Sequence, residues 1–205
     1  MPENREFSYM TVTKLAQPGD FVVVEFSHND GGAPKPSDNG RSNCPDTGDV
    51  THTTKIGAVV KAFDAYMTEA TQTFGKLRAH VIISSQTPNS HWESGTFNYA
   101  ASSLIRGAAL AAKNVANGNI TFVDHGQYAA NANKALGKEA VGAFYPNDHI
   151  HTSPAGADVV SKEFVKCVVC VNILSKNYVK NEMSTILGAC IWSCNKIGRR
   201  TSIFL

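Results

Sequence analysis

Three short apolar segments rich in β-branched residues alternate with helix-like segments, and this alternation constrains the fold more than any other feature. The apolar segments are residues 21–26, 80–85 and 120–124. Nearly continuous Val, Ile and Phe is typical of a strand covered on both faces. Strands that alternate with helices favour a parallel sheet with helices on both faces. We therefore predict an α/β fold.

The segments around these strands predict the helices and one long loop. A last helix is expected to begin after Ser153, which suits an N-cap, with Pro154 at its first position. Residues 31–54 are rich in Gly, Pro, Asp, Asn and Thr. They predict a long loop, a feature that is often functional in compact domains. The other predicted helices span residues 7–15, 56–74, 96–117 and 126–136.

Size and charge exclude several classes of protein. The 205 residues, 42% hydrophobic and 18% charged, fit one soluble domain. The net charge of +2 comes from residues 171–205, which contain five basic residues and one acidic residue. Basic residues do not cluster with aromatic or polar ones as a nucleic-acid interface requires, so we expect no nucleic-acid partner. No apolar run is long enough to span a membrane, and the first residues do not read as a signal peptide. We expect a monomer without a membrane partner.

The five cysteines allow two interpretations. They stand at positions 44, 167, 170, 190 and 194. The spacing of the last four has some likeness to a zinc site. The alternative is a disulfide between Cys170 and Cys190, which would tie the end of the chain to the last helix in an oxidising compartment.

Asp148 and His151 form the first candidate for chemistry. A carboxylate three residues before a histidine on a loop can accept the imidazole Nδ1–H and leave Nε2 as a base. The same residues could instead cap the entry to a helix. A third interpretation is a metal site built from Asp148, His149 and His151, since alternate histidines can share an ion.

Asn29 is the second candidate. It follows the first predicted strand, where a side-chain amide can donate to an oxyanion. The alternative is a simple turn, because Asn-Asp-Gly-Gly suits turns. Ligands of parallel sheets bind beyond the carboxyl ends of the strands. We therefore expect the loops at 27–32, 86–95 and 147–153 to meet at one rim, with Asn29 beside His151.

Several motifs together resemble one enzyme family. They are VEFSHNDGG at 24–32, SSQTPN at 84–89, WE at 92–93 with GT at 95–96, FVDH at 122–125 and DHIHTSPAGA at 148–157. In order and spacing they resemble the SGNH (GDSL-type) hydrolases, most closely the rhamnogalacturonan acetylesterase group, over about residues 5–190.

The resemblance implies a fold, a reaction and its residues. The fold would be a three-layer α/β/α sandwich with a parallel sheet, and the activity would be deacetylation of pectic rhamnogalacturonan outside the cell. Asp148 and His151 would be the catalytic acid and base, and Asn29 an oxyanion donor. Cys170 and Cys190 would form a family disulfide. No metal or organic cofactor is implied, and Trp92 could either stack on a sugar or pack inside.

The chain also departs from the family pattern at several positions, and these departures are as informative as the matches. The family begins with a strand leading to Gly-Asp-Ser, whose serine is the nucleophile, and a later glycine supplies an oxyanion amide. Nothing in this chain aligns with either block, and the context of Ser84, Ser85 and Ser90 recommends none of them. Ser27 stands where the family usually has glycine, and His52 where relatives have a cysteine eight residues after Cys44.

The simplest account of these departures is an incomplete chain that lacks its signal sequence and first two strands. Residues 1–170 would be the hydrolase-like domain and 171–205 a C-terminal segment, of which 191–205 resembles nothing in the family. Two functions follow. One is an acetylesterase whose serine is missing here, and the other is a catalytically inactive remnant or a carbohydrate-binding pseudoenzyme.

Overall fold

A computed structural model provides the fold and describes residues 11–30, 32–35, 40–115, 119–180, 183–186 and 188–191. Residues 11–15 are helical, at the end of the first predicted helix. The remaining elements are β1 (Phe21–Val24), β2 (Thr51–Thr53), β3 (Val59–Lys61), α2 (Phe63–Lys76), β4 (His80–Ser84), α3 (Ser103–Asn114), β5 (Ile120–Val123), α4 (His125–Gly142), α5 (Pro154–Val171), η1 (Leu174–Tyr178) and η2 (Met183–Thr185).

The chain divides into two compact units. The first comprises Met1–Ser84 and Ser103–Phe122, and the second comprises Ser85–Ser102 and Val123–Leu205. The second unit continues across residue 170, where we predicted a domain boundary. That boundary stays a prediction. The described part of the C-terminal segment belongs to the second unit.

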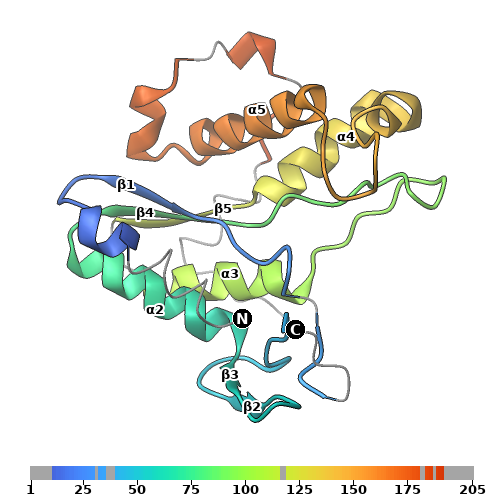
Figure 1. The fold of residues 1–205 in the computed structure, drawn as a ribbon. Helices are drawn as coiled ribbons and strands as arrows, with labels where there is room; N and C mark the ends of the chain where they lie inside the picture. Colours follow the sequence, from blue (N-terminus) through green and yellow to red (C-terminus); the bar gives the residue numbers. More distant parts are fainter. Residues whose placement is uncertain are drawn as a thin grey trace. The chain divides into compact units, whose positions relative to one another are not determined.

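The sheet has the order β1-β4-β5 (Figure 1). β1 and β4 are parallel and in register from Phe21 opposite His80 to Val24 opposite Ile83. β5 runs the same way, because Val81 N donates to Asn119 O and, four residues on along both strands, Ser85 N donates to Val123 O. The predicted α/β class with a parallel sheet flanked by helices is thus confirmed.

Burial differs between the strands in a way that the apolar pattern did not predict. In the central strand β4, Val81, Ile82 and Ile83 are all buried. In β1, Val22 and Val24 are buried, but Val23 between them is 49% exposed. The expectation that the first strand is covered on both faces was therefore wrong, because successive side chains of β1 point to opposite faces of the sheet and the face that carries Val23 is only partly covered.

Helices α2 and α3 of the first unit pack on each other and on β4 (Figure 1). Gly107 of α3 allows the close approach, since a Cβ there would lie 3.0 Å from the Phe63 ring of α2. Both helices are shorter than predicted. α2 begins at Phe63 rather than at residue 56, and α3 at Ser103 rather than at residue 96.

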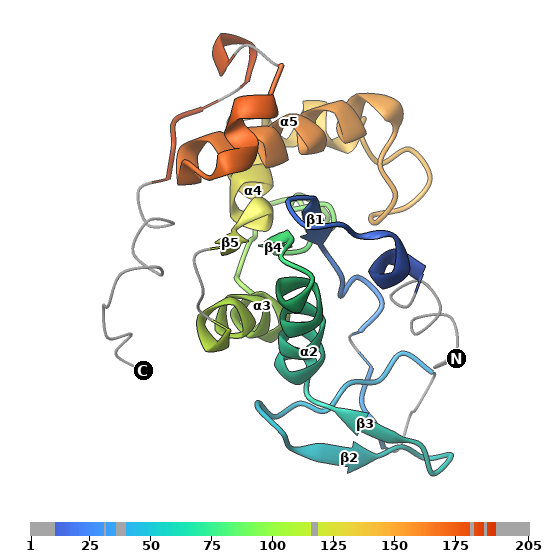
Figure 2. The same ribbon diagram turned by 90° about the vertical axis from the view of Figure 1, so that its left-hand side faces the viewer.

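A β-hairpin takes the place of the expected first turns of α2. β2 and β3 pair antiparallel, with His52 opposite Val60, and β3 leads directly into α2 (Figure 2). β2 falls within the segment predicted to be an irregular loop. Local composition favoured a loop and a helix, but the strand pairing satisfies the backbone groups of both segments.

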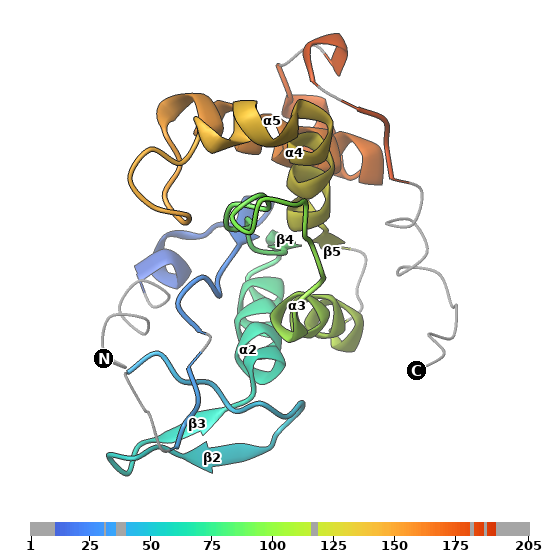
Figure 3. The ribbon, with the colours of Figure 1, turned by 90° about the vertical axis from the view of Figure 1, so that its right-hand side faces the viewer.

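In the second unit α4 packs against α5 (Figure 3). α4 bends at Gly137, whose φ of 82° only glycine adopts readily. α5 begins as predicted, with the Ser153 side chain accepting a hydrogen bond from Gly156 N. The predicted disulfide between Cys170 and Cys190 is present. The described part of the chain has no helix that is both long and apolar enough to cross a membrane.

We predict that Gly126→Ala lowers the free energy of unfolding by about 1–3 kcal/mol, because a Cβ at residue 126 would lie 2.6 Å from the carbonyl oxygen of Gln86. Backbone cannot rotate away as a side chain can. Gly142→Ala, in the same helix, meets nothing within 4 Å and should be neutral or slightly stabilising. Urea denaturation of the two variants checks this, and equal stabilities would contradict it.

Candidate active site

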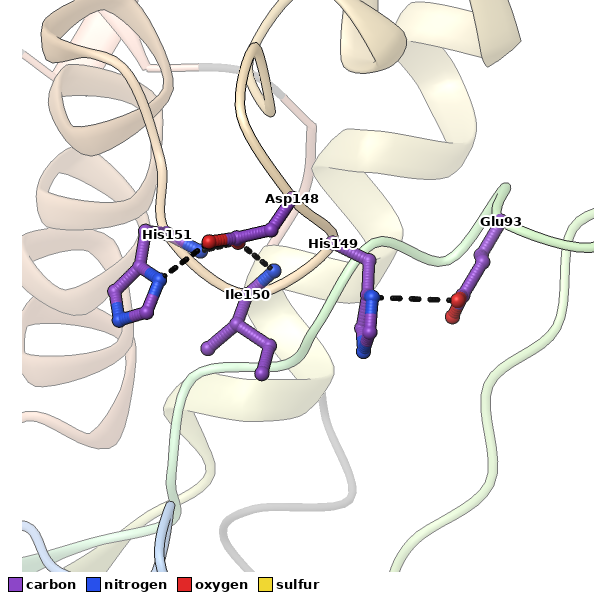
Figure 4. Close-up of polar contacts among 5 residues, drawn as sticks. All are labelled: Glu93, Asp148, His149, Ile150 and His151. Atoms are coloured by element: carbon purple, nitrogen blue, oxygen red, sulfur yellow. Dashed lines mark hydrogen bonds and ion pairs between the residues drawn. The ribbon is translucent and has the colours of Figure 1, made fainter.

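Asp148 and His151 lie together on the loop between α4 and α5 in the second unit (Figure 4). One carboxylate oxygen of Asp148, Oδ1, accepts hydrogen bonds from the backbone N–H groups of Ile150 and His151, both at 2.7 Å. The other, Oδ2, is 2.7 Å from the imidazole Nδ1 of His151. The loop thus folds back so that its own carboxylate holds both the backbone and the ring.

These hydrogen bonds keep Asp148 ionised and set the tautomer of the neutral His151 ring. The backbone N–H of His151, then its imidazole, then the backbone N–H of Ile150 hold the pKa of Asp148 well below its usual range. The carboxylate is therefore ionised at any ordinary pH and can only accept at Oδ2. Nδ1 of His151 must carry the proton, which leaves Nε2 with a free lone pair when the ring is neutral. The His151 side chain is 79% exposed, so Nε2 is accessible.

Segment 86–95 supports this loop within the same unit. Ser90 N donates to His149 O at 2.8 Å, and the Tyr145 hydroxyl donates to Pro88 O at 3.3 Å. The His149 imidazole forms an ion pair with Glu93 at 3.3 Å when protonated (Figure 4). Two of the three loops expected to meet, 86–95 and 147–153, are therefore in contact.

The support segment is anchored by aromatic and polar contacts. The Trp92 indole N–H donates to Asn133 O at 3.2 Å, and its ring meets the edge of Phe97. These contacts favour the packing role for Trp92 over an open sugar platform. His91 is buried beside the Asn133 amide, and burial lowers its pKa to about 4, so it is neutral at physiological pH.

Ser84 and Ser85 are buried in polar contacts of their own. The Ser84 hydroxyl donates to the Glu25 carboxylate. The Ser85 hydroxyl donates to Asp124 at 2.9 Å and accepts from Gly126 N at 2.9 Å. Burial raises the pKa of Asp124. Among the described residues, the side-chain partner of His151 is Asp148 rather than either of these serines.

Asn29 lies on a tight turn in the first unit, after β1. Asp30 N donates to Ser27 O at 2.9 Å, which closes the turn and leaves Asn29 exposed. Ser27, at the start of the turn, has a φ of 117°, in a region that favours glycine. The turn interpretation of this motif therefore holds for the backbone, and the oxyanion role of the side chain stays a prediction.

The metal interpretation of the loop has no geometric support. His149 turns toward Glu93, whereas His151 turns toward Asp148 (Figure 4). Among the described residues, metal-ligating atoms come together at another place, formed by Cys44, Asp46 and His52. The sequence pattern did not predict this ligand set, and Cys44 and His52 stood out only because the family has a second cysteine where this chain has His52.

Comparison with known proteins agrees with these motifs. No family model matches the chain. A rhamnogalacturonan acetylesterase of Emericella nidulans is 45% identical over 172 residues, which are 82% of this chain and 69% of that protein. The chain belongs to the rhamnogalacturonan acetylesterase family.

A solved structure shows the same fold. Protein YXIM of Bacillus subtilis superposes with a TM-score of 0.61 at 16% identity, over 83% of this chain. The match spans 43% of that protein, so this member of the acetylesterase family covers less than half of its length. The predicted resemblance to the rhamnogalacturonan acetylesterases is confirmed by the relative, and the solved structure shares the predicted α/β fold.

We predict that Asp148→Asn changes the tautomer of His151. An amide at residue 148 can offer its NH₂ to Nδ1, which would then become an acceptor and move the proton to Nε2. Nitrogen chemical shifts of the neutral imidazole measure this directly. Wild type should show a protonated Nδ1 and the variant a protonated Nε2. Identical spectra would mean that the carboxylate does not set the tautomer.

We also predict that Ser27→Gly raises the free energy of unfolding by about 1 kcal/mol, or the Tm by about 2–4 °C. Glycine removes the strain at φ of 117° but adds entropy to the unfolded chain, which offsets part of the gain. Ser27→Ala keeps the Cβ and should not gain. If alanine stabilises as much as glycine, the hydroxyl rather than the backbone is responsible. Thermal unfolding of wild type, Ser27→Gly and Ser27→Ala measures the three Tm values.

Proposed function

We propose that this chain belongs to an esterase that removes acetyl groups from pectic rhamnogalacturonan outside the cell. The observation that carries the proposal is the hydrogen bond between Asp148 and His151, with Nε2 accessible. This pair of residues occurs in a chain that is 45% identical to a rhamnogalacturonan acetylesterase. Orientation of an imidazole by an ionised carboxylate is the arrangement that serine acyl transfer requires.

The proposed reaction proceeds through an acyl-enzyme. His151 Nε2 takes the proton of a serine hydroxyl as its oxygen attacks the acetyl carbonyl carbon. The Asp148 carboxylate stabilises the imidazolium that forms, and the imidazolium then protonates the sugar oxygen as the ester bond breaks. A water molecule, deprotonated by the same nitrogen, releases acetate and restores the serine.

Asn29 is the proposed donor to the oxyanion. Its amide N–H would stabilise the negative charge on the carbonyl oxygen in the tetrahedral intermediate, and loss of one such donor typically costs about 10²–10³ in rate. The side chain is exposed at the head of its turn, so no packing role competes with this one.

The nucleophilic serine of this proposed mechanism is the component for which the sequence offers no counterpart to the family motif. The Gly-Asp-Ser block of the family has no counterpart in the 205 residues, and Ser84 and Ser85 are held by carboxylates and a backbone amide. This observation favours a second candidate function, a carbohydrate-binding protein without turnover. The two candidates differ in whether His151 affects ester hydrolysis.

We predict slow release of acetate from acetylated rhamnogalacturonan by the 205-residue chain, through water activated by His151. A histidine with a free Nε2 lone pair can act as general base on water directly, which typically contributes about 10²–10⁴-fold, so the rate should exceed the uncatalysed one. His151→Ala should lower it at least about tenfold, and His149→Gln, a change at the neighbouring ring of the same loop, should not. Enzymatic assay of acetate measures all three.

Equal rates with and without His151 would contradict the catalytic proposal for this chain. The binding candidate then predicts that acetylated oligosaccharide shifts the imidazole resonances of His151 in an NMR titration, without any release of acetate. A chain that neither hydrolyses nor binds the polysaccharide would exclude both candidates.

A further inference from the structure

Three side chains with metal-ligating atoms converge in the first unit, and none of them is among the residues proposed for ester hydrolysis. Cys44 and Asp46 come from the loop before β2, and His52 lies in β2. Asp46 Oδ2 is 3.7 Å from Cys44 Sγ and 2.8 Å from His52 Nε2, and the three ligating atoms all lie within 4.8 Å of one another.

We propose that Cys44, Asp46 and His52 bind a zinc ion. Thiolate, imidazole and carboxylate are the ligands that zinc takes in proteins, whereas Mg²⁺ and Ca²⁺ prefer all-oxygen sites. Three protein ligands leave a fourth position for water. The ligands are different residues from Asp148 and His151, so the proposal does not depend on the proposed function.

One of the distances between the ligating atoms fits a tetrahedral zinc site, and one is too short. Bond lengths of about 2.3 Å to sulfur and about 2.1 Å to oxygen or nitrogen place sulfur about 3.6 Å from oxygen, and oxygen about 3.4 Å from nitrogen. The sulfur–oxygen distance of 3.7 Å already matches. The nitrogen–oxygen distance of 2.8 Å is shorter than a shared ion requires. The His52 and Asp46 side chains can rotate apart, because they are 42% and 53% exposed.

The backbone holds these residues in place without an ion. Cys44 N donates to Lys61 O at 3.2 Å, which ties the loop to the end of β3. His52 is opposite Val60 in the hairpin. The buried carboxylate of Asp64 accepts two contacts from Gly48 N, at 3.1 and 2.9 Å, in the segment between Asp46 and His52. A preorganised set of ligands loses little conformational entropy on binding.

The surroundings suit an ion that is closed on one side and open on the other. Cys44 is 1% exposed, and a zinc ion that binds its sulfur must displace the thiol proton to solvent. His52 lines an open hollow of about 450 Å³ together with Pro34, Lys35 and Pro45. This hollow gives a water ligand access. The bound ion would join the loop to β2 and stabilise the hairpin.

Cobalt titration of the whole chain tests the ligands. Co²⁺ in place of zinc should give the visible bands of a tetrahedral site and a thiolate-to-cobalt band in the near ultraviolet, with one ion per chain, and zinc should remove both. Cys44→Ser should abolish the thiolate band, whereas Cys167→Ala and Cys194→Ala should retain it. A thiolate band that survives Cys44→Ser, or no band in wild type, overturns the proposal.

His52→Gln separates a metal site from a hydrogen-bonded cluster. Glutamine can still donate to Asp46, so a cluster without an ion keeps its stability. The variant should bind cobalt at least about tenfold more weakly. Zinc at about a hundredfold excess over its Kd should raise the Tm of wild type by about 5–10 °C and that of the variant much less. Equal zinc-induced shifts in the two proteins would overturn the proposal.

Discussion

The carboxylate of Asp148 accepts three hydrogen bonds from residues within its own loop, and the candidate site depends on them. Two come from the backbone N–H groups of Ile150 and His151 and one from the His151 ring. A carboxylate with these partners stays ionised, so the tautomer of the ring follows from the fold of four residues. The long-range contacts of Ser90 and Tyr145 then hold that loop against the segment after β4.

Buried polar groups connect the fold to the site. At the end of β4 the Ser85 hydroxyl bridges the Asp124 carboxylate and the start of α4, and Gly126 leaves room for the backbone of Gln86. The segment that supports the His151 loop begins at this point. In the first unit the Asp64 carboxylate similarly holds the loop that carries Cys44 and Asp46. In both places a carboxylate helps to hold a surface loop through hydrogen bonds to other parts of the chain.

Regular elements were predictable wherever the local pattern was strong. The three strands, the Ser153 cap of α5 and the Cys170–Cys190 disulfide agree with the sequence analysis. The start of α2 was not predictable in this way, because residues 59–61 pair as a strand of a hairpin instead of forming the first turns of the helix. Strand pairing is a non-local interaction, which periodicity cannot show. The strain at Ser27 was visible only as a residue where the family usually has glycine, and the φ of 117° provides its reason.

The sequence by itself determined the α/β class, the family and the short-range pair of Asp148 and His151. These depend on alternating hydrophobicity, on ordered motifs and on a carboxylate three residues from an imidazole. Tertiary structure alone decided that His149 turns away to Glu93, that the Ser84 and Ser85 hydroxyls are hydrogen-bonded to carboxylates, and that Cys44, Asp46 and His52 come together. Most of these depend on contacts between segments distant in the chain, whose geometry only the packed fold determines.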